Sequence, residues 1–239
     1  MDDNNINLSI VNGLTSNAKG IFKGVFTSDE LNNIHITSDI FDDNNPRSLV
    51  FNTVRRVGDS RIGHWLSIST MYSSNIGILK LTYFDSFAQS FKKQNKSINN
   101  FINNIKVSCH NRNIKFVLEE INRQIQNNKS AVCGAYCVYV IINSHERPSS
   151  SLNRIFVNFK GNTKNNDTKI LKYIISVWPS ESCNNMSHNS SDKLSLDFII
   201  KNIYIYKPNF CPKYTFLNKE NKCLKMCKCP MCCKDNHTL

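Results

Sequence analysis

Short apolar segments in the first half of the chain predict a series of strands. Residues 48–52 (SLVFN) predict a buried strand. Residues 63–68 (GHWLSI) have the pattern of a second strand, with a histidine at its start. Residues 78–86 (ILKLTYFDS) predict another strand, whose end delivers a carboxylate. A further strand is expected over residues 114–118.

Other segments have the pattern of helices. Apolar residues at positions 98, 101, 102 and 105 fall on one face of an amphipathic helix. Residues 169–178 predict a second helix with an apolar face, and Pro179 ends it. The run AVCGAYCVYVII over residues 131–142 is apolar throughout and, at 12 residues, too short to span a bilayer. It predicts a fully buried helix with Ser130 as its N-cap.

The order of these elements predicts both the fold class and the organisation of the chain. Strands gathered mostly between residues 48 and 118, with helices on either side, indicate an α+β fold around a mixed or antiparallel sheet. Residues 1–20 are polar and Asn-rich and are expected to form an N-terminal arm, followed by a folded domain over residues 21–180. Residues 181–195 are rich in Ser and Asn and read as a linker to a C-terminal tail, residues 196–239.

Cys133 lies near the start of the predicted buried helix, a position that suits a reactive thiol. The free backbone N–H groups and the positive end of the helix dipole favour a thiolate over a thiol there. A lone cysteine in an apolar helix is more often core packing, since the free thiol behaves as a small hydrophobe. The residues that accompany Cys133 must therefore decide between the two interpretations.

Three polar residues complete a recognisable set. His64 opens one predicted strand, Asp85 ends the next, and Gln126 lies a short distance before Cys133. Taken singly, the histidine would be an ordinary strand residue, the aspartate a turn residue and the glutamine a solvated loop amide. Together they supply a base, an orienting acid, a carboxamide donor and a thiol, which is the set that a cysteine hydrolase needs.

The sequence around these residues resembles the adenovirus-type maturation proteases (adenain-like), within the wider clan of ubiquitin-like-protein proteases. The resemblance rests on the dipeptide His64-Trp65, the run Tyr83-Phe84-Asp85 and the spacing from Gln126 to Cys133-Gly134. It covers roughly residues 20 to 180 and implies a papain-like α+β domain, with the nucleophile on a buried helix. Adenain typically has Glu where this chain has Asp85, which is the residue of the SUMO-protease branch, so the branch stays open.

The resemblance implies a Cys-His-Asp mechanism. Cys133 would be deprotonated by His64, and Asp85 would hold the other ring nitrogen of the imidazole. The Cys133 backbone N–H and the Gln126 side-chain NH2 would stabilise the oxyanion, with Gln124 as a weaker competitor for that role. The chemistry requires no metal and no organic cofactor.

The resemblance also indicates the class of substrate. Trp65, beside the histidine, is either a core residue or one wall of a narrow substrate cleft, and proteases of this clan favour Gly near the scissile bond. We therefore expect an endopeptidase of viral or virus-derived origin that cleaves structural precursor proteins. The alternative within enzymes is a SUMO or ubiquitin-like deconjugating protease.

Composition indicates the compartment in which the protein works. The chain has 239 residues, 40% of them hydrophobic, and its start lacks the basic and apolar regions of a secretory signal. Only four of the ten cysteines precede residue 200, and a catalytic thiol among unpaired cysteines favours a reducing compartment. We expect a soluble, intracellular protein without a membrane partner, monomeric, and in the host nucleus or the virion if it is viral.

The net charge of +12 and the pI of about 9.3 favour association with nucleic acid through phosphate neutralisation. The alternative is a solvated, lysine-rich surface. The adenain resemblance implies viral DNA and a viral peptide as activators. A non-enzymatic alternative is a basic nucleic-acid packaging protein that keeps the protease domain only as a scaffold.

The C-terminal tail combines cysteines with positive charge. From residue 211 to the end there are six lysines against one glutamate and one aspartate, a net charge of +4. A Cys-x-x-Cys pair within the tail is half of a zinc knuckle. The candidate zinc ligands are Cys223, Cys227, Cys229 and Cys232. Reactive free thiols or disulfides in a virion are the alternatives.

Overall fold

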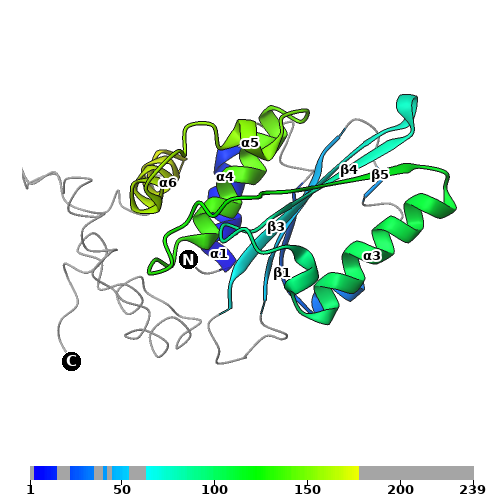
Figure 1. Ribbon diagram of the computed structural model, residues 1–239, viewed down its shortest axis with the longest axis horizontal. Coiled ribbons are helices and arrows are strands. Elements are labelled where there is room, and N and C mark those ends of the chain that lie inside the picture. Colours follow the sequence, from blue (N-terminus) through cyan, green and yellow to red (C-terminus); the bar gives the residue numbers. More distant parts are fainter. Residues whose placement is uncertain (1–2, 15–21, 35–39, 42–44, 54–62, 178–239) are drawn as a thin grey trace, which may run out of the picture.

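The computed structural model describes residues 3–14, 22–34, 40–41, 45–53 and 63–177 (Figure 1). The predicted linker over residues 181–195, the Cys-rich tail and its zinc candidates lie outside the described residues.

A mixed sheet of five strands forms the centre of the described structure. The strands are β1 (Phe22–Thr27), β2 (Arg47–Asn52), β3 (Trp65–Ser73), β4 (Ile78–Phe84) and β5 (Lys115–Glu120). They follow one another across the sheet in chain order; the two central pairings are antiparallel and the two outer pairings are parallel. The predicted α+β class, with a mixed central sheet, is confirmed.

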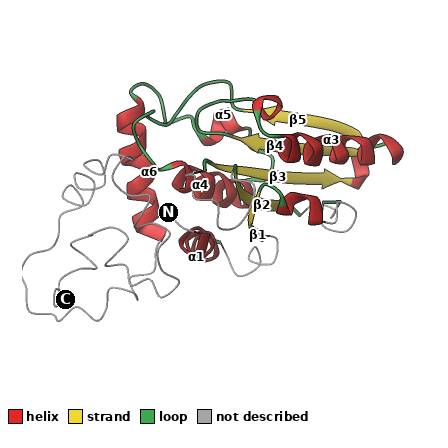
Figure 2. Ribbon diagram, turned by 90° about the horizontal axis from the view of Figure 1, so that it is seen from below, coloured by secondary structure: helices red, strands yellow, loops and turns green. Residues whose placement is uncertain are grey.

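Helices cover both faces of this sheet (Figures 1 and 2). One face carries α1 (Asp3–Gly13), α4 (Cys133–Glu146), α5 (Leu152–Ile155) and α6 (Thr163–Val177), and the other carries α3 (Lys96–Asn111). Of three short 3-10 turns, η2 (Glu30–Asn33) and η3 (Ser74–Ile76) each connect two strands, and η4 (Phe91–Lys93) lies between β4 and α3. Within the described residues, none of the helices has the length and apolarity needed to cross a membrane.

The predicted amphipathic helix is α3. Its buried residues are Ile98, Phe101, Ile102, Ile105 and Cys109, which repeat at the helical spacing and pack on the sheet. The Asn95 side chain caps the helix by accepting a hydrogen bond from the Ile98 backbone N–H at 3.1 Å. The same amide donates to the Thr53 carbonyl oxygen at 3.1 Å, so the cap also ties α3 to the end of β2.

The predicted buried helix is α4, and ten of its residues are buried, from Cys133 to Asn143. It packs across β3, where Ser67 and Ser69 present small side chains and let the helix approach closely. The prediction that Ser130 caps this helix is wrong. The helix begins at Cys133, Val132 is the N-cap without a side-chain bond, and the Ser130 hydroxyl donates instead to the Asn127 carbonyl oxygen at 2.9 Å.

The N-terminal segment differs from the polar arm expected over residues 1–20. Residues 3–13 form α1, which packs against α4 and buries Ile6 and Ile10 completely. Gly13 lies so close to the Ile142 side chain that a β-carbon there would collide with it. Ile6, Ile10 and Leu14 repeat at the helical spacing on the buried side, and tertiary packing rather than helix propensity stabilises the segment.

Candidate active site

Strand pairing brings His64 and Asp85 to the same end of the sheet. Strand β3 starts at Trp65 and its antiparallel neighbour β4 ends at Phe84, so the residue before β3 and the residue after β4 meet. The His64 Nε2 and Asp85 Oδ1 atoms lie 2.8 Å apart. The bond uses Nε2 and leaves Nδ1 as the ring nitrogen that can face a thiol.

His64 is held by backbone bonds as well as by its ring. Its N–H donates to Thr53 Oγ1 at 2.8 Å, and its carbonyl accepts from the Thr53 N–H at 2.9 Å. The Phe87 ring lies against the imidazole, with ring centroids 4.8 Å apart and planes tilted by 33°. These contacts restrict the imidazole to one orientation before any substrate is present.

Asp85 is buried, with a side chain 1% exposed, and three donors surround it. Besides His64, the Phe87 N–H donates to Oδ1 at 2.7 Å and the Gln94 side-chain amide donates to Oδ2 at 3.2 Å. A buried carboxylate is stable only when it is satisfied in this way. Its fixed negative charge stabilises a positive imidazole ring.

Cys133 is the first residue of α4, and it is 8% exposed. Burial alone would raise the pKa of its thiol, but the hydrogen bond and charge of the His64 ring and a bond from the Trp65 backbone amide lower that pKa below its usual value. The first N–H groups of the helix lack intrahelical acceptors and also favour the anion. The structure therefore brings His64 and Cys133 together in the arrangement of a thiolate–imidazolium pair.

The imidazole shows the matching shift. Burial opposes the charge on His64, yet the hydrogen bonds to Asp85 and Cys133 raise its pKa from 6.5 to about 9. The two shifts have a common cause, because each charged partner stabilises the other. Both shifts favour the ionised pair over the neutral thiol and imidazole.

Gln126 lies in the loop before α4 and is 1% exposed, not the solvated amide of the ordinary interpretation. Its Oε1 atom accepts a bond from the Ser86 hydroxyl at 2.5 Å, and its Nε2 donates to the Ser130 carbonyl oxygen at 2.9 Å. An amide NH2 carries two hydrogens, and these bonds use one of them. The second hydrogen is the one that an oxyanion could accept from.

Gln124, the weaker competitor, has a different environment. Its Nε2 donates to the Gln126 carbonyl oxygen at 2.7 Å and to Asn128 Oδ1 at 2.5 Å. Both of its amide hydrogens are thus used within the loop. This pattern favours Gln126 over Gln124 as the carboxamide donor.

Two neighbours of the site are clearly placed in the core. Trp65 is partly buried and packs against the core between the sheet and α4. This core contact is compatible with a second role of the indole as a wall of the substrate cleft. Cys137, one turn after Cys133, is fully buried. Burial and the neighbouring Cys133 thiolate raise the pKa of the Cys137 thiol well above its usual value. A thiol kept neutral in this way is inert.

Several contacts of the site were not singled out from the sequence. They come from Thr53, Ser86, Phe87 and Gln94. Ser86 directly follows Asp85, and that adjacency was an available signal. Phe87 and Gln94 carry no sequence pattern that marks them, because their role depends on how the chain turns after β4.

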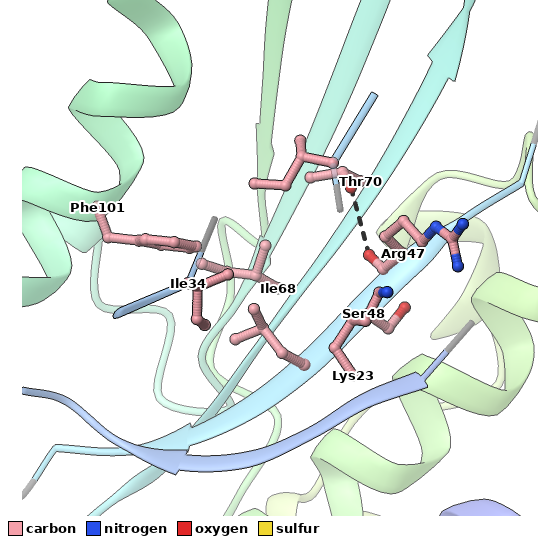
Figure 3. A pocket seen from close by; sticks show the side chains of 9 residues that line it. Lys23, Ile34, Arg47, Ser48, Ile68, Thr70 and Phe101 are labelled. Atoms are coloured by element: carbon pink, nitrogen blue, oxygen red, sulfur yellow. Dashed lines mark hydrogen bonds between the residues drawn. The ribbon is translucent and has the colours of Figure 1, made fainter. Parts of the chain in front are cut away.

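No metal site competes with this site among the described residues. They contain no group of three or more His, Cys, Asp or Glu side chains that could hold a metal ion. A small pocket lies between the sheet and α3, where Phe101, Ile34 and Ile68 meet beside Arg47 and Thr70 (Figure 3). His64, Asp85, Gln126 and Cys133 do not line it.

No protein-family model matches the chain, and no curated protein is significantly similar to it. A crystal structure of the ASFV pS273R protease aligns with 72% of this chain and 66% of its own, at 14% identity and a TM-score of 0.45. A selenomethionine form of that protease aligns with 56% of this chain and 43% of its own, at 16% identity and a TM-score of 0.40.

A third solved structure is ChlaDub1 from Chlamydia trachomatis. It aligns with 60% of this chain and 62% of its own, at 14% identity and a TM-score of 0.39. The chain therefore spans between 43% and 66% of the length of these three structures. At such identities and TM-scores the likenesses carry no argument about activity. The function must be inferred from the geometry of His64, Asp85, Gln126 and Cys133.

Proposed function

We propose that the protein is a cysteine peptidase with Cys133 as its nucleophile. The observation that carries this proposal is the junction of three elements: the His64 ring, bound to Asp85 at 2.8 Å, also bonds the thiol at the N-terminus of α4. A buried cysteine in a core role has no need of a basic partner, and Cys137 in the same helix contacts the Ser67 hydroxyl instead. The shifts of the pKa of His64 and Cys133 in opposite directions support a reactive pair.

The geometry supports a two-step mechanism. The Cys133 thiolate attacks the scissile carbonyl carbon, a C–S bond forms, and the electron pair of the C=O bond moves to oxygen. The His64 imidazolium then gives its proton to the leaving amine nitrogen as the C–N bond breaks. Water, deprotonated by His64, hydrolyses the resulting thioester, and the proton returns to the pair.

The oxyanion requires donors at the place where negative charge develops. The Cys133 backbone N–H is free of an intrahelical acceptor because it starts the helix, and the Gln126 NH2 has a hydrogen left over. Donors in such a position contribute about 3 kcal/mol each to the stability of the transition state. We assign the oxyanion role to these two groups. No step of the mechanism needs a metal or an organic cofactor.

For the substrate we propose structural precursor proteins, cleaved internally near Gly-containing sites by a viral or virus-derived enzyme. Trp65 beside the histidine would form one wall of the substrate cleft. Removal of SUMO or ubiquitin-like proteins from conjugates is the alternative. A deconjugating protease would recognise a folded modifier, whereas an endopeptidase would recognise a short internal peptide.

A substrate panel tests the proposal. Purified protein is incubated with internally quenched peptides that contain Gly-Gly and with fluorogenic SUMO and ubiquitin derivatives, with Cys133→Ala and Cys137→Ala measured alongside. We expect turnover that Cys133→Ala abolishes and that Cys137→Ala preserves. Turnover that survives Cys133→Ala but not Cys137→Ala would overturn the assignment. The substrate class that is cleaved decides between endopeptidase and deconjugase.

A further inference from the structure

The turn that follows β4 contacts both halves of the proposed active site. Asp85 reaches the His64 ring, and the next residue, Ser86, reaches the Gln126 side chain. Ser86 is 0% exposed. Its carbonyl oxygen accepts bonds from the Ile125 and Gln126 backbone N–H groups at 3.0 and 3.2 Å, so this turn holds the glutamine loop at its backbone as well.

The turn itself is tightly constrained. Ala88 has a φ of 57°, a left-handed conformation that alanine seldom adopts, and its N–H donates to the Asp85 carbonyl oxygen at 2.9 Å. Such a conformation persists where the surrounding structure over-determines it. The turn therefore keeps Asp85 and Ser86 in a fixed relation to each other.

The polarity of the Ser86–Gln126 bond matters. The two ends of a carboxamide have similar shapes but opposite hydrogen-bonding roles, and a glutamine amide rotated by half a turn would exchange them. A hydroxyl can donate to oxygen, and the Ser130 carbonyl can only accept. Oxygen toward Ser86 and nitrogen toward Ser130 is the orientation in which both contacts involve a donor and an acceptor. In this orientation the NH2 group keeps a hydrogen for a further acceptor.

We propose that Ser86 is a positioning residue that holds the Gln126 carboxamide with its NH2 ready for the oxyanion. The inference rests on the proposed function and deepens it, because Ser86 acts only through Gln126 and does not touch substrate. One turn then organises two separate tasks. Asp85 orients the proton-transfer group, and Ser86 orients the oxyanion donor.

Two small reagents separate these tasks without knowledge of the natural substrate. Alkylation of Cys133 by iodoacetamide displaces iodide at a saturated carbon, forms no oxyanion, and reports the thiolate alone. Acylation by p-nitrophenyl acetate forms a C–S bond at a carbonyl carbon through an oxyanion and releases p-nitrophenolate. Both rates are measured on the full chain, and mass spectrometry after proteolysis quantifies the adduct on Cys133 separately from those on the other nine cysteines.

The variant is Ser86→Ala, which keeps the carbonyl contacts and removes the hydroxyl. Its matched control is Ser69→Ala in strand β3, which removes another buried hydroxyl, bonded to Ser48 Oγ at 2.8 Å. We expect Ser86→Ala to slow acylation about 10-fold, less than the roughly 100-fold loss expected for Gln126→Ala. Alkylation should change less than about 2-fold, and Ser69→Ala should leave both rates near wild type.

A double variant distinguishes positioning from a general structural role. If Ser86 acts through Gln126, adding Ser86→Ala to Gln126→Ala should cause no further loss of acylation. An additive loss, an equal fall of alkylation and acylation, or an unchanged acylation rate in Ser86→Ala would each overturn the Ser86 role. Failure of the proposed function gives a different result: wild-type Cys133 would then form no acyl adduct at all.

Discussion

Neutralising Asp85 should move the alkaline limit of peptidase activity, because that limit is set by the loss of the His64 proton. The pKa of His64 is raised from 6.5 to about 9, against the effect of burial, by its bonds to Asp85 and Cys133. A hydrogen bond to a charged group contributes about 1.5–3 kcal/mol. Since about 1.4 kcal/mol corresponds to one pKa unit, Asp85→Asn should lower the pKa of His64 by about 1 to 2 units.

The direction of the effect on activity follows from the mechanism. The imidazolium must give a proton to the leaving amine, so activity falls as pH rises through the pKa of His64. In the wild type the fall should come near pH 9. In Asp85→Asn it should come at about pH 7 to 8, given the shift of one to two units. The thiolate itself persists above this limit.

The assay is kcat/KM against pH on one cleavable substrate, whose alkaline limb reports the free enzyme. Glu120→Gln is the control, because that carboxylate accepts bonds from the Phe91 N–H at 2.8 Å and the Ser90 hydroxyl at 3.3 Å rather than from His64. Its profile should match the wild type. An alkaline limb that stays in place in Asp85→Asn would refute the view that this carboxylate stabilises the imidazolium.

Gln126→Ala should lower kcat roughly 100-fold with little change in KM, because the amide acts mainly in the transition state; an unchanged kcat would remove it from the oxyanion site. Burial, with a smaller effect of Arg47, lowers the pKa of His145 to about 4, so the wild type should lose stability as pH falls from 6.5 toward 4. In that pH range the unfolded state binds the proton more strongly than the folded state does. His145→Leu should therefore lose about 2 kcal/mol less free energy of unfolding than the wild type. An equal pH dependence of the free energy of unfolding in both proteins would contradict this. Truncation after Trp178 should weaken salt-sensitive binding to duplex DNA and remove about one equivalent of zinc while Cys133 stays reactive, whereas unchanged DNA affinity or a metal-free full-length protein would reject those roles of the tail.

The parts of the fold with a simple pattern of apolar residues could be predicted from the sequence. Helix α3 buries a face that repeats at the helical spacing, whereas β2, β3 and β4 are runs of mostly buried residues and α4 is apolar over most of its length. Because the side chains of His64, Asp85 and Cys133 directly flank or begin these elements, their approach could be predicted as well. Predictions succeeded where burial alone decides the structure.

The predictions that failed involve polar residues with tertiary partners. Helix α6 begins at Thr163, earlier than its apolar pattern suggests, because Asn166 and Asp167 are buried and bonded to the loop around Ile125 and Asn127 rather than to water. Ser130 bonds a loop carbonyl instead of capping α4. A single sequence does not reveal which polar residue meets which partner, since that depends on contacts between distant segments.

The polar first turns of α6 have a consequence for the site. The Asp167 carboxylate accepts a bond from the Tyr136 hydroxyl of α4 at 2.8 Å and from the Asn127 N–H at 3.3 Å. It thereby joins the helix that begins with Cys133 to the loop that carries Gln126. The spacing from Gln126 to Cys133 in the sequence encodes that proximity only because this network folds the loop back onto α4.

The most direct test of the central claim is to identify the residue that becomes acylated during turnover. Wild-type protein is mixed with a cleavable substrate, quenched in acid within the first turnover, and analysed by mass spectrometry after proteolysis. We predict a thioester that carries the N-terminal part of the substrate on Cys133, absent from Cys133→Ala and strongly reduced in His64→Ala. An acyl group on another residue, or turnover with no covalent adduct on Cys133 at any quench time, would contradict the proposed function.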